Sequence, residues 1–205
     1  MNLDVLILCG GRGTRLRGLW DAPKCLVPIG GIPLIERLFI KLCALNPEFV
    51  ALATGIWREE VKQFTWAHTH NLQLIDAPDL QGRGNRKGTA MAVRRAAGRG
   101  LVGAPLLVLN GDTLPLYDLA SLVAYHEARV GAWGTLAVRH DAATWHDVYA
   151  GACVLSEAAL DEICADDRTQ DFPAHLVGAN RYVVPGFLDV GTPEGFQRAK
   201  EWRDE

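Results

Sequence analysis

The sequence predicts an α/β fold: one domain with a mostly parallel central sheet and helices on both faces. Short apolar runs that suit buried strands alternate with segments in which apolar residues recur every three or four positions, as in amphipathic helices. From residue 5 to residue 75 the order is β-α-β-α-β, which favours a parallel sheet with right-handed crossovers. The 205 residues, 49% of them hydrophobic, suffice for one domain over residues 1–205 and are too few for two ordinary ones.

The expected elements can be placed by their periodicity and their flanking residues. Strands are expected at 5–9, 49–54, 72–75, 106–109, 133–139 and 149–155, and extended segments at 182–184 and 187–190. Helices are expected at 33–45, 57–66, 89–97 and 115–129, after the N-cap Ser156, at 171–178, and from Pro193 with Thr192 as N-cap. The stretch 140–148 is polar and is expected to be irregular.

Composition and charge exclude several classes of protein. A net charge of −3 gives no overall attraction to nucleic acid or to an anionic membrane. The N-terminus has no basic leader region, and no apolar run approaches the ~20 residues of a membrane-spanning helix. The 5 cysteines are odd in number and include no C-x-x-C pair, so they are expected to be reduced and mostly buried. We therefore expect a cytoplasmic protein without nucleic-acid or membrane partners; homo-oligomerisation stays open.

A glycine-rich loop after the first strand has the composition of an anion-binding loop. It contains Gly10, Gly11, Arg12, Gly13, Thr14 and Arg15. Glycines let the backbone turn sharply and bring its N–H groups close to an anion, while arginine supplies forked donors that suit phosphate oxygens. A tight turn that binds nothing is the alternative. The spacing excludes a P-loop, and Leu16 stands where the dinucleotide fingerprint requires its third glycine, so a different kind of nucleotide or phosphate loop is indicated.

Two aspartates follow expected strands in the second half of the chain. Asp112 comes just after the strand 106–109, and Asp189 lies near the end of the extended segment 187–190. Open α/β sheets hold ligands at the carboxyl ends of their strands, although each aspartate alone is equally typical of a turn. Mg²⁺ takes one or two carboxylates together with phosphate oxygens and water. The pair, combined with the phosphate loop, predicts a Mg²⁺ site.

Five motifs together resemble the sugar-1-phosphate nucleotidylyltransferases, in the same order along the chain. They are Leu8-Cys9-Gly10-Gly11-Arg12-Gly13-Thr14-Arg15-Leu16, Pro23-Lys24, Gly88-Thr89-Ala90, Asn110-Gly111-Asp112 and Asp189-Val190-Gly191-Thr192-Pro193-Glu194. The resemblance spans nearly the whole chain. It implies a Rossmann-like domain that joins a nucleoside triphosphate to a sugar 1-phosphate, forms a nucleoside diphosphate sugar and releases pyrophosphate.

The resemblance also implies a role for each matching residue. The nucleotide is expected to contact Leu8, Cys9, Gly10, Gly11, Arg12, Gly13, Thr14, Gly88, Thr89 and Asn110. Arg15 and Lys24 are the expected catalytic cations, and Asp112 and Asp189 the expected Mg²⁺ ligands. Gly111 and Gly151 are further candidates for contact with the substrate.

The resemblance is compatible with several hypotheses about the activity. The short chain looks most like the heptose-1-phosphate guanylyltransferases, which makes GTP the best estimate of the donor. A uridylyl- or cytidylyltransferase acting on another phosphorylated acceptor is an alternative, as is a non-catalytic nucleotide sensor on the same fold. A molybdenum-cofactor guanylyltransferase shares fold and length, but the motifs around Asp112 and Asp189 argue against it.

The chain departs from the family pattern where the acceptor phosphate would bind. The Glu-Lys-Pro motif that usually supplies a lysine is absent, whereas the stretch 83–87 is longer and more basic than in the family. We predict that Arg83, Arg86 or Lys87 replaces that lysine. Alanine substitution of each should raise the acceptor KM in at least one case, measured by steady-state kinetics; an unchanged KM in all three would refute the replacement.

Overall fold

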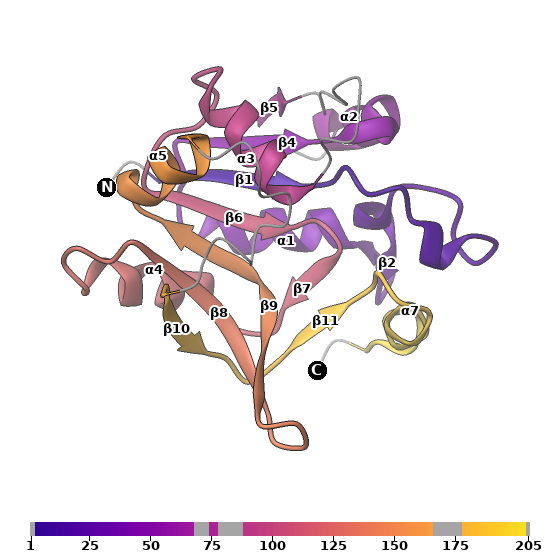
Figure 1. The fold of residues 1–205 in the computed structure, drawn as a ribbon. Coiled ribbons are helices and arrows are strands. Elements are labelled where there is room, and N and C mark those ends of the chain that lie inside the picture. Colours follow the sequence, from indigo (N-terminus) through magenta and orange to yellow (C-terminus); the bar gives the residue numbers. More distant parts are fainter. Residues whose placement is uncertain (1–2, 68–73, 78–87, 166–177, 204–205) are drawn as a thin grey trace.

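The computed structural model describes residues 3–67, 74–77, 88–165 and 178–203 and shows an α/β fold (Figure 1). Its main sheet has seven strands in the order β10-β8-β9-β6-β1-β4-β5. These strands are β1 (Asp4–Leu8), β4 (Phe49–Ala53), β5 (Leu74–Ala77), β6 (Leu106–Asn110), β8 (Gly134–Asp141), β9 (His146–Leu155) and β10 (Asn180–Val183). Two small sheets pair β2 (Pro28–Ile29) with β3 (Ile32–Pro33), and β7 (Thr113–Pro115) with β11 (Phe187–Asp189).

The order of elements in the first part of the chain confirms the predicted β-α-β-α-β unit. The helices of the structure are α1 (Leu34–Cys43), α2 (Arg58–Ala67), α3 (Thr89–Ala97), α4 (Leu119–Glu127), α5 (Glu157–Ala165) and α7 (Pro193–Glu201). Strand β1 pairs in parallel with β4 and β6, and β4 pairs in parallel with β5. Strand β9 is antiparallel to both of its neighbours, β6 and β8. The sheet is therefore mostly parallel, as predicted.

Helices cover both faces of the sheet because neighbouring residues of each strand point to opposite sides. On β1, Val5 and Ile7 belong to the apolar cluster that includes residues of α1, α4 and α7. Leu6, between them, belongs to the second cluster, with residues of α3 and α5. Among the described residues, no helix combines the length and the apolar character needed to cross a membrane.

The predicted helix 115–129 begins later than expected. Residues 113–115 form strand β7, and α4 starts only at Leu119. The carboxylate of Asp118 caps this helix by accepting N–H donors from Ala120 at 3.2 Å and Ser121 at 2.9 Å. Pro115 resembled a first helical residue, but pairing with β11 keeps its segment extended.

The predicted irregular stretch 140–148 is instead largely strand. Strand β8 continues to Asp141 and β9 begins at His146, so the two form a hairpin in which these residues pair. Both sides of this hairpin end are largely exposed, so polar residues occupy it without the apolar alternation that marks a half-buried strand. The predicted helix 171–178 falls almost entirely outside the described residues.

The β7–β11 pair brings together two segments that are far apart in the sequence. Asp189 on β11 pairs with Thr113 on β7, and the N–H of Val190 donates to the carbonyl of Asp112 at 2.9 Å. Asp189 ends a strand just ahead of a helix, as predicted. Its strand is antiparallel and lies in a separate two-stranded sheet.

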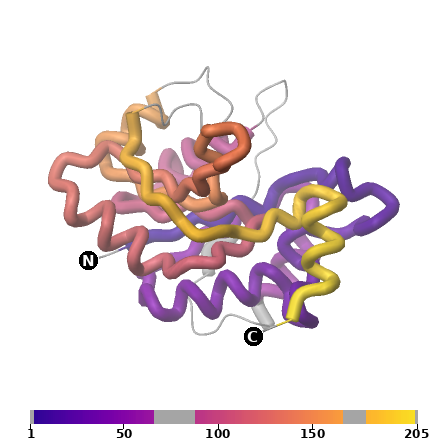
Figure 2. The backbone as a smooth tube through the Cα atoms, turned by 90° about the horizontal axis from the view of Figure 1, so that it is seen from below, coloured from indigo at the N-terminus to yellow at the C-terminus, as the bar shows by residue number. Residues whose placement is uncertain are grey.

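Helix α7 follows this pair directly and lies beside the N-terminal segment. Figure 2 shows it (yellow) next to the indigo segment, and the rings of Trp20 and Phe196 lie 6.0 Å apart between centroids. As predicted, Thr192 is the N-cap and Pro193 opens the helix; the Thr192 hydroxyl accepts from the N–H of Gly195 at 3.1 Å. A Cβ on Gly195 would lie 1.6 Å from the carbonyl oxygen of Asp189, so this close approach requires glycine.

We predict that Gly195→Ala destabilises the protein by about 3 kcal/mol or more, because the added methyl group would force α7 away from β11. Gly186→Ala is the matched control, since its Cβ would meet only Leu116 Cδ1, at 3.9 Å. Denaturant unfolding of both variants checks this. Equal midpoints for the two variants would contradict it.

Candidate active site

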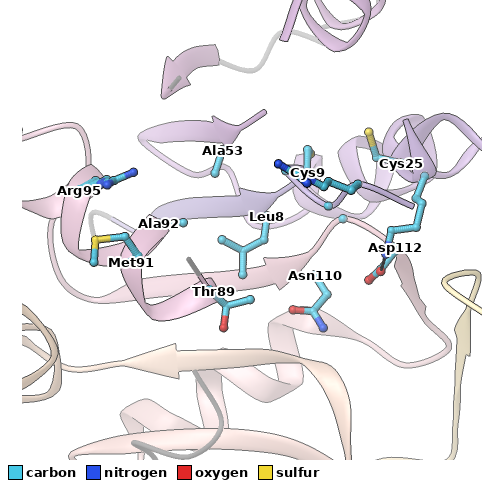
Figure 3. Close-up of a pocket in the computed structure, with 16 residues that line it drawn as sticks. Leu8, Cys9, Cys25, Ala53, Thr89, Met91, Ala92, Arg95, Asn110 and Asp112 are labelled. Atoms are coloured by element: carbon cyan, nitrogen blue, oxygen red, sulfur yellow. Dashed lines mark hydrogen bonds and ion pairs between the residues drawn. The ribbon is translucent and has the colours of Figure 1, made fainter. Parts of the chain in front are cut away.

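A cavity of about 410 Å³ opens at the carboxyl ends of β1, β4 and β6, where parallel sheets hold ligands (Figure 3). Five segments supply its walls: the end of β1 with the glycine-rich loop after it, the short turn at Lys24 and Cys25, the end of β4, the first two turns of α3, and the end of β6 with the turn after it. The lining residues are Leu8, Cys9, Gly10, Gly11, Arg12, Lys24, Cys25, Ala53, Gly88, Thr89, Met91, Ala92, Arg95, Asn110, Gly111 and Asp112.

The loops after β1, β4 and β6 touch one another at the base of this cavity. The N–H of Cys9 donates to the carbonyl of Ala53 at 2.8 Å, and the N–H of Gly111 donates to that of Leu8 at 3.0 Å. A Cβ on Gly111 would lie 2.8 Å from the Leu8 carbonyl oxygen. A Cβ on Gly55, whose φ is +62°, would lie 2.6 Å from the Cα of Gly10. Glycine at both positions thus lets the three loops meet.

The side chain of Lys24 runs along the glycine-rich loop. Its Cε lies 3.2 Å from the place where a Cβ on Gly11 would stand, and its Cγ lies 3.8 Å from the corresponding place on Gly13. Gly13 has a φ of +64° and precedes a single 3₁₀ turn, η1 (Thr14–Leu16). Lys24 opens a second such turn, η2 (Lys24–Leu26). The arginines of the loop, Arg12 and Arg15, are exposed.

An ion pair joins this loop to the end of β6. The ammonium group of Lys24 donates to Asp112 Oδ2. The two side chains are 20% and 25% exposed, so solvent screens their attraction less than it would on an open surface. Lys24 is thereby held over the cavity, with its charge directed at the aspartate end.

Asp189 lies beside Gly191, close to the same ion pair. Its Oδ1 accepts the N–H of Gly191 at 2.7 Å. A Cβ on Gly191 would lie 2.9 Å from both Asp112 Oδ2 and Asp189 Oδ1, and 3.3 Å from Lys24 Nζ. Two carboxylates and one ammonium group therefore converge on the place that a side chain at position 191 would occupy.

Burial raises the pKa of the Asp189 carboxyl above its usual range, and the negative charge of Asp112 raises it further. The Gly191 N–H and the charges of Lys24 and Arg15 act in the opposite direction. Arg15 thus contributes to the electrostatic environment of Asp189, although it does not line the cavity.

The donor set suits a hard divalent cation. Asp112 and Asp189 present carboxylate oxygens, the ligands that Mg²⁺ prefers, and in the described ranges no third acidic, histidine or cysteine side chain joins them. Two carboxylates are enough for Mg²⁺ when substrate phosphates and water complete the shell. A cation would also relieve the cost of keeping Asp189 ionised. The residues therefore fit the predicted ion.

Two thiols lie at the floor of the cavity. The Cys9 side chain interacts with that of Cys25; this contact, and then burial, raises the pKa of Cys9. The neutral thiol is a poor nucleophile. Cys9, Cys25 and Cys153 are buried, as predicted, whereas Cys43 and Cys164 are exposed.

The structure gathers most of the predicted site residues in one place. Eleven of them line the cavity: Leu8, Cys9, Gly10, Gly11, Arg12, Lys24, Gly88, Thr89, Asn110, Gly111 and Asp112. Among the described candidates, Gly13, Thr14, Arg15, Gly151 and Asp189 do not line it. Gly151 instead packs against Thr113: a Cβ added to Gly151 would lie 2.7 Å from the Cβ of Thr113. Arg83, Arg86 and Lys87 lie outside the described residues.

Sequence reasoning missed some of the residues that line the site. They are Cys25, Ala53, Met91, Ala92 and Arg95. Helical spacing contained a usable signal, because Ala92 lies three positions after Thr89 and Arg95 three positions after Ala92, and side chains at this spacing are neighbours on a helix. Gly191 belongs to the motif that begins at Asp189, but only the tertiary structure shows that two carboxylates converge on it.

Comparison with known proteins identifies a family and several relatives of this chain. The model of the MobA-like NTP transferase domain matches residues 5–177. Mannose-1-phosphate guanylyltransferase of Mycobacterium tuberculosis is 29% identical over 197 residues, 95% of this chain and 52% of the relative. The bifunctional protein GlmU of Cellvibrio japonicus is 35% identical over 122 residues, 58% of this chain and 24% of the relative. The chain thus spans about half, or less, of these relatives' length.

Solved structures share the fold. HddC from Yersinia pseudotuberculosis, which has also been solved with GMP-PN, superposes with a TM-score of 0.73 at 22% identity and covers 97% of this chain and 98% of its own. A UDP-glucose pyrophosphorylase complexed with UDP-glucose has a TM-score of 0.79 at 14% identity, covering 98% of both chains. These likenesses confirm the predicted Rossmann-like fold. Since the family model matches most of its length, the chain belongs to the MobA-like NTP transferase domain family.

Proposed function

We propose that this chain is a Mg²⁺-dependent sugar-1-phosphate nucleotidylyltransferase with GTP as its donor. It transfers the nucleoside monophosphate to a sugar 1-phosphate and releases pyrophosphate. The whole of residues 1–205 forms one catalytic domain, which works in the cytoplasm on small molecules, without nucleic acid or a membrane.

The observation that carries the proposal is the convergence of Lys24, Asp112 and Asp189 on Gly191, beside the glycine-rich loop. A triphosphate brings three phosphoryl groups and needs positive charge and N–H donors around it. In such transfers, catalysis consists mainly of positioning and charge neutralisation, so the protein requires no nucleophile of its own. The neutral Cys9 thiol agrees with this requirement.

The reaction forms one bond and breaks one. An oxygen of the sugar phosphate attacks the α-phosphorus, and the electron pair of the α–β bridging bond leaves with pyrophosphate. The N–H groups of loop 10–13 hold the phosphates, while Lys24 and Arg15 take up the charge that develops on them. When bound to Asp112 and Asp189, Mg²⁺ supplies further neutralisation of phosphate charge.

The names of the relatives support the donor and acceptor classes. One relative is a mannose-1-phosphate guanylyltransferase, and one structural neighbour was solved with GMP-PN. Other neighbours were solved as a glucose-1-phosphate thymidylyltransferase and a UDP-glucose pyrophosphorylase. The acceptor is therefore proposed as a class, a sugar 1-phosphate, and not as one compound.

The proposal is tested by measuring pyrophosphate release with GTP, ATP, UTP and CTP against a panel of sugar 1-phosphates, with and without Mg²⁺. Release that requires both a sugar 1-phosphate and Mg²⁺ and is fastest with GTP is the expected result. If a triphosphate binds but no acceptor is used, the chain is a nucleotide sensor. Turnover that persists in a chelator would refute the Mg²⁺ requirement.

We predict that Gly191→Ala lowers kcat by roughly 10²-fold, because the methyl group would separate the two carboxylates and displace Lys24. The fold should survive the change, since the methyl group meets side-chain ends that can move away. Gly186→Ala, in the same C-terminal segment, should leave kcat unchanged. Initial rates and thermal unfolding of both variants check this; a fully active Gly191→Ala protein would disprove the arrangement.

We predict that Asp189→Asn stabilises the metal-free protein at neutral pH while abolishing activity. A raised folded-state pKa means that protonated Asp189 favours folding, and that this contribution is lost as pH rises through the folded pKa. Asparagine is uncharged at every pH. The stability gain of Asp189→Asn over the wild type should therefore shrink as the pH falls and Asp189 of the wild type becomes protonated.

Thermal unfolding in EDTA between pH 3 and 8 measures this difference. Asp118→Asn is a control of opposite sign: its hydrogen bond from Ser121 lowers the pKa of Asp118, so the loss of its charge should reduce stability at neutral pH. If Asp189→Asn is less stable than the wild type at pH 7, the ionised Asp189 carboxylate does not destabilise the fold and the prediction is wrong.

A further inference from the structure

The cavity has two chemically different ends. Asp112 and the glycine-rich loop lie at one end, and Met91 and Arg95 of α3 lie at the other (Figure 3). The proposed function assigns phosphates to the Asp112 end, where Lys24 and the loop supply positive charge. A nucleoside triphosphate is elongated, so its base lies at the α3 end, as far from the transferred phosphates as the molecule reaches.

The lining of the α3 end is largely apolar, as in pockets that hold a planar base. Leu8 and Ala53 come from neighbouring strands, and Ala92 and Met91 from the helix that crosses them. Such apolar side chains suit the faces of a planar ring, and they exclude water that would compete for its polar edge. The pocket therefore needs only a few polar groups to choose between bases.

Among the described residues that line the cavity, Arg95 is the one with a charged side chain at this end (Figure 3). It is half-buried and lies four residues after Met91 and three after Ala92 on α3, so the three side chains project from the same side of the helix. Arginine offers two parallel N–H donors in a rigid fork and accepts nothing. Its best partner is an edge with two adjacent acceptors.

Of the two purine bases, guanine presents such an edge, through O6 and N7. Adenine places an N–H₂ donor beside N7, which arginine cannot satisfy, whereas glutamine can pair with both groups. We propose that Arg95 selects guanine by donating to O6 and N7, and is thus the residue that determines the donor base. This inference rests on the proposed function and extends it to a named contact.

The test is calorimetric binding of GTP, 7-deaza-GTP and ATP to the full chain, in buffer with Mg²⁺ and without acceptor. 7-deaza-GTP lacks only the N7 acceptor. The wild-type protein should bind GTP about 10-fold more tightly than either analogue, the size expected for one bidentate contact. In Arg95→Ala, GTP and 7-deaza-GTP should bind within about 2-fold of each other, because the donor that distinguishes them is gone.

Two further variants keep the test decisive. Arg95→Gln should reverse the order of GTP and ATP, since glutamine matches the adenine edge. Arg99→Ala removes an exposed arginine just beyond α3 and should behave as wild type. These outcomes do not depend on how well Arg95→Ala folds.

The failures are distinguishable. Equal binding of GTP and 7-deaza-GTP to the wild type, or a preference that survives in Arg95→Ala, would overturn the assignment of Arg95 and leave the proposed function standing. Absence of binding to every triphosphate would overturn both.

Discussion

The ion pair between Lys24 and Asp112 connects the parts on which the site depends. Lys24 belongs to the segment that follows the glycine-rich loop, and Asp112 to the turn that follows β6. Asp189 completes the group from the far end of the chain, across Gly191. Without a bound nucleotide, the ammonium group neutralises carboxylates that would otherwise repel each other. In the proposed function the same groups receive phosphates and a cation, and their closeness means that little reorganisation would be needed on binding.

Close backbone contacts make this arrangement possible. Gly55 against Gly10, and Gly111 against Leu8, bring the loops after three parallel strands into direct contact. Gly195 lets α7 approach β11, which holds Asp189 in place. Each contact would be lost with the smallest side chain. Glycines therefore fix the positions of the charged groups here, while the charged groups supply the chemistry.

The charges also carry a cost. Burial opposes the ionisation of Asp189, and the neighbouring Asp112 adds to the penalty. A protein selected only for stability would not keep two carboxylates this close. Their closeness beside the glycine-rich loop suits the proposed cation and polyphosphate, and it illustrates the general conflict between stability and activity.

The sequence by itself determined the fold class, the glycine-rich loop and the candidates Lys24, Asp112 and Asp189, because strand periodicity, glycine spacing and residue chemistry are local properties. It misplaced the start of α4, since β7 exists only through its pairing with β11. It also did not reveal Arg95 as part of the cavity, or Gly191 as the point where the charges meet. Helical spacing makes Arg95 a neighbour of Ala92 on α3, but which face of α3 lines the cavity, and where the charges meet, depend on contacts between segments far apart in the chain, so the tertiary structure decided them.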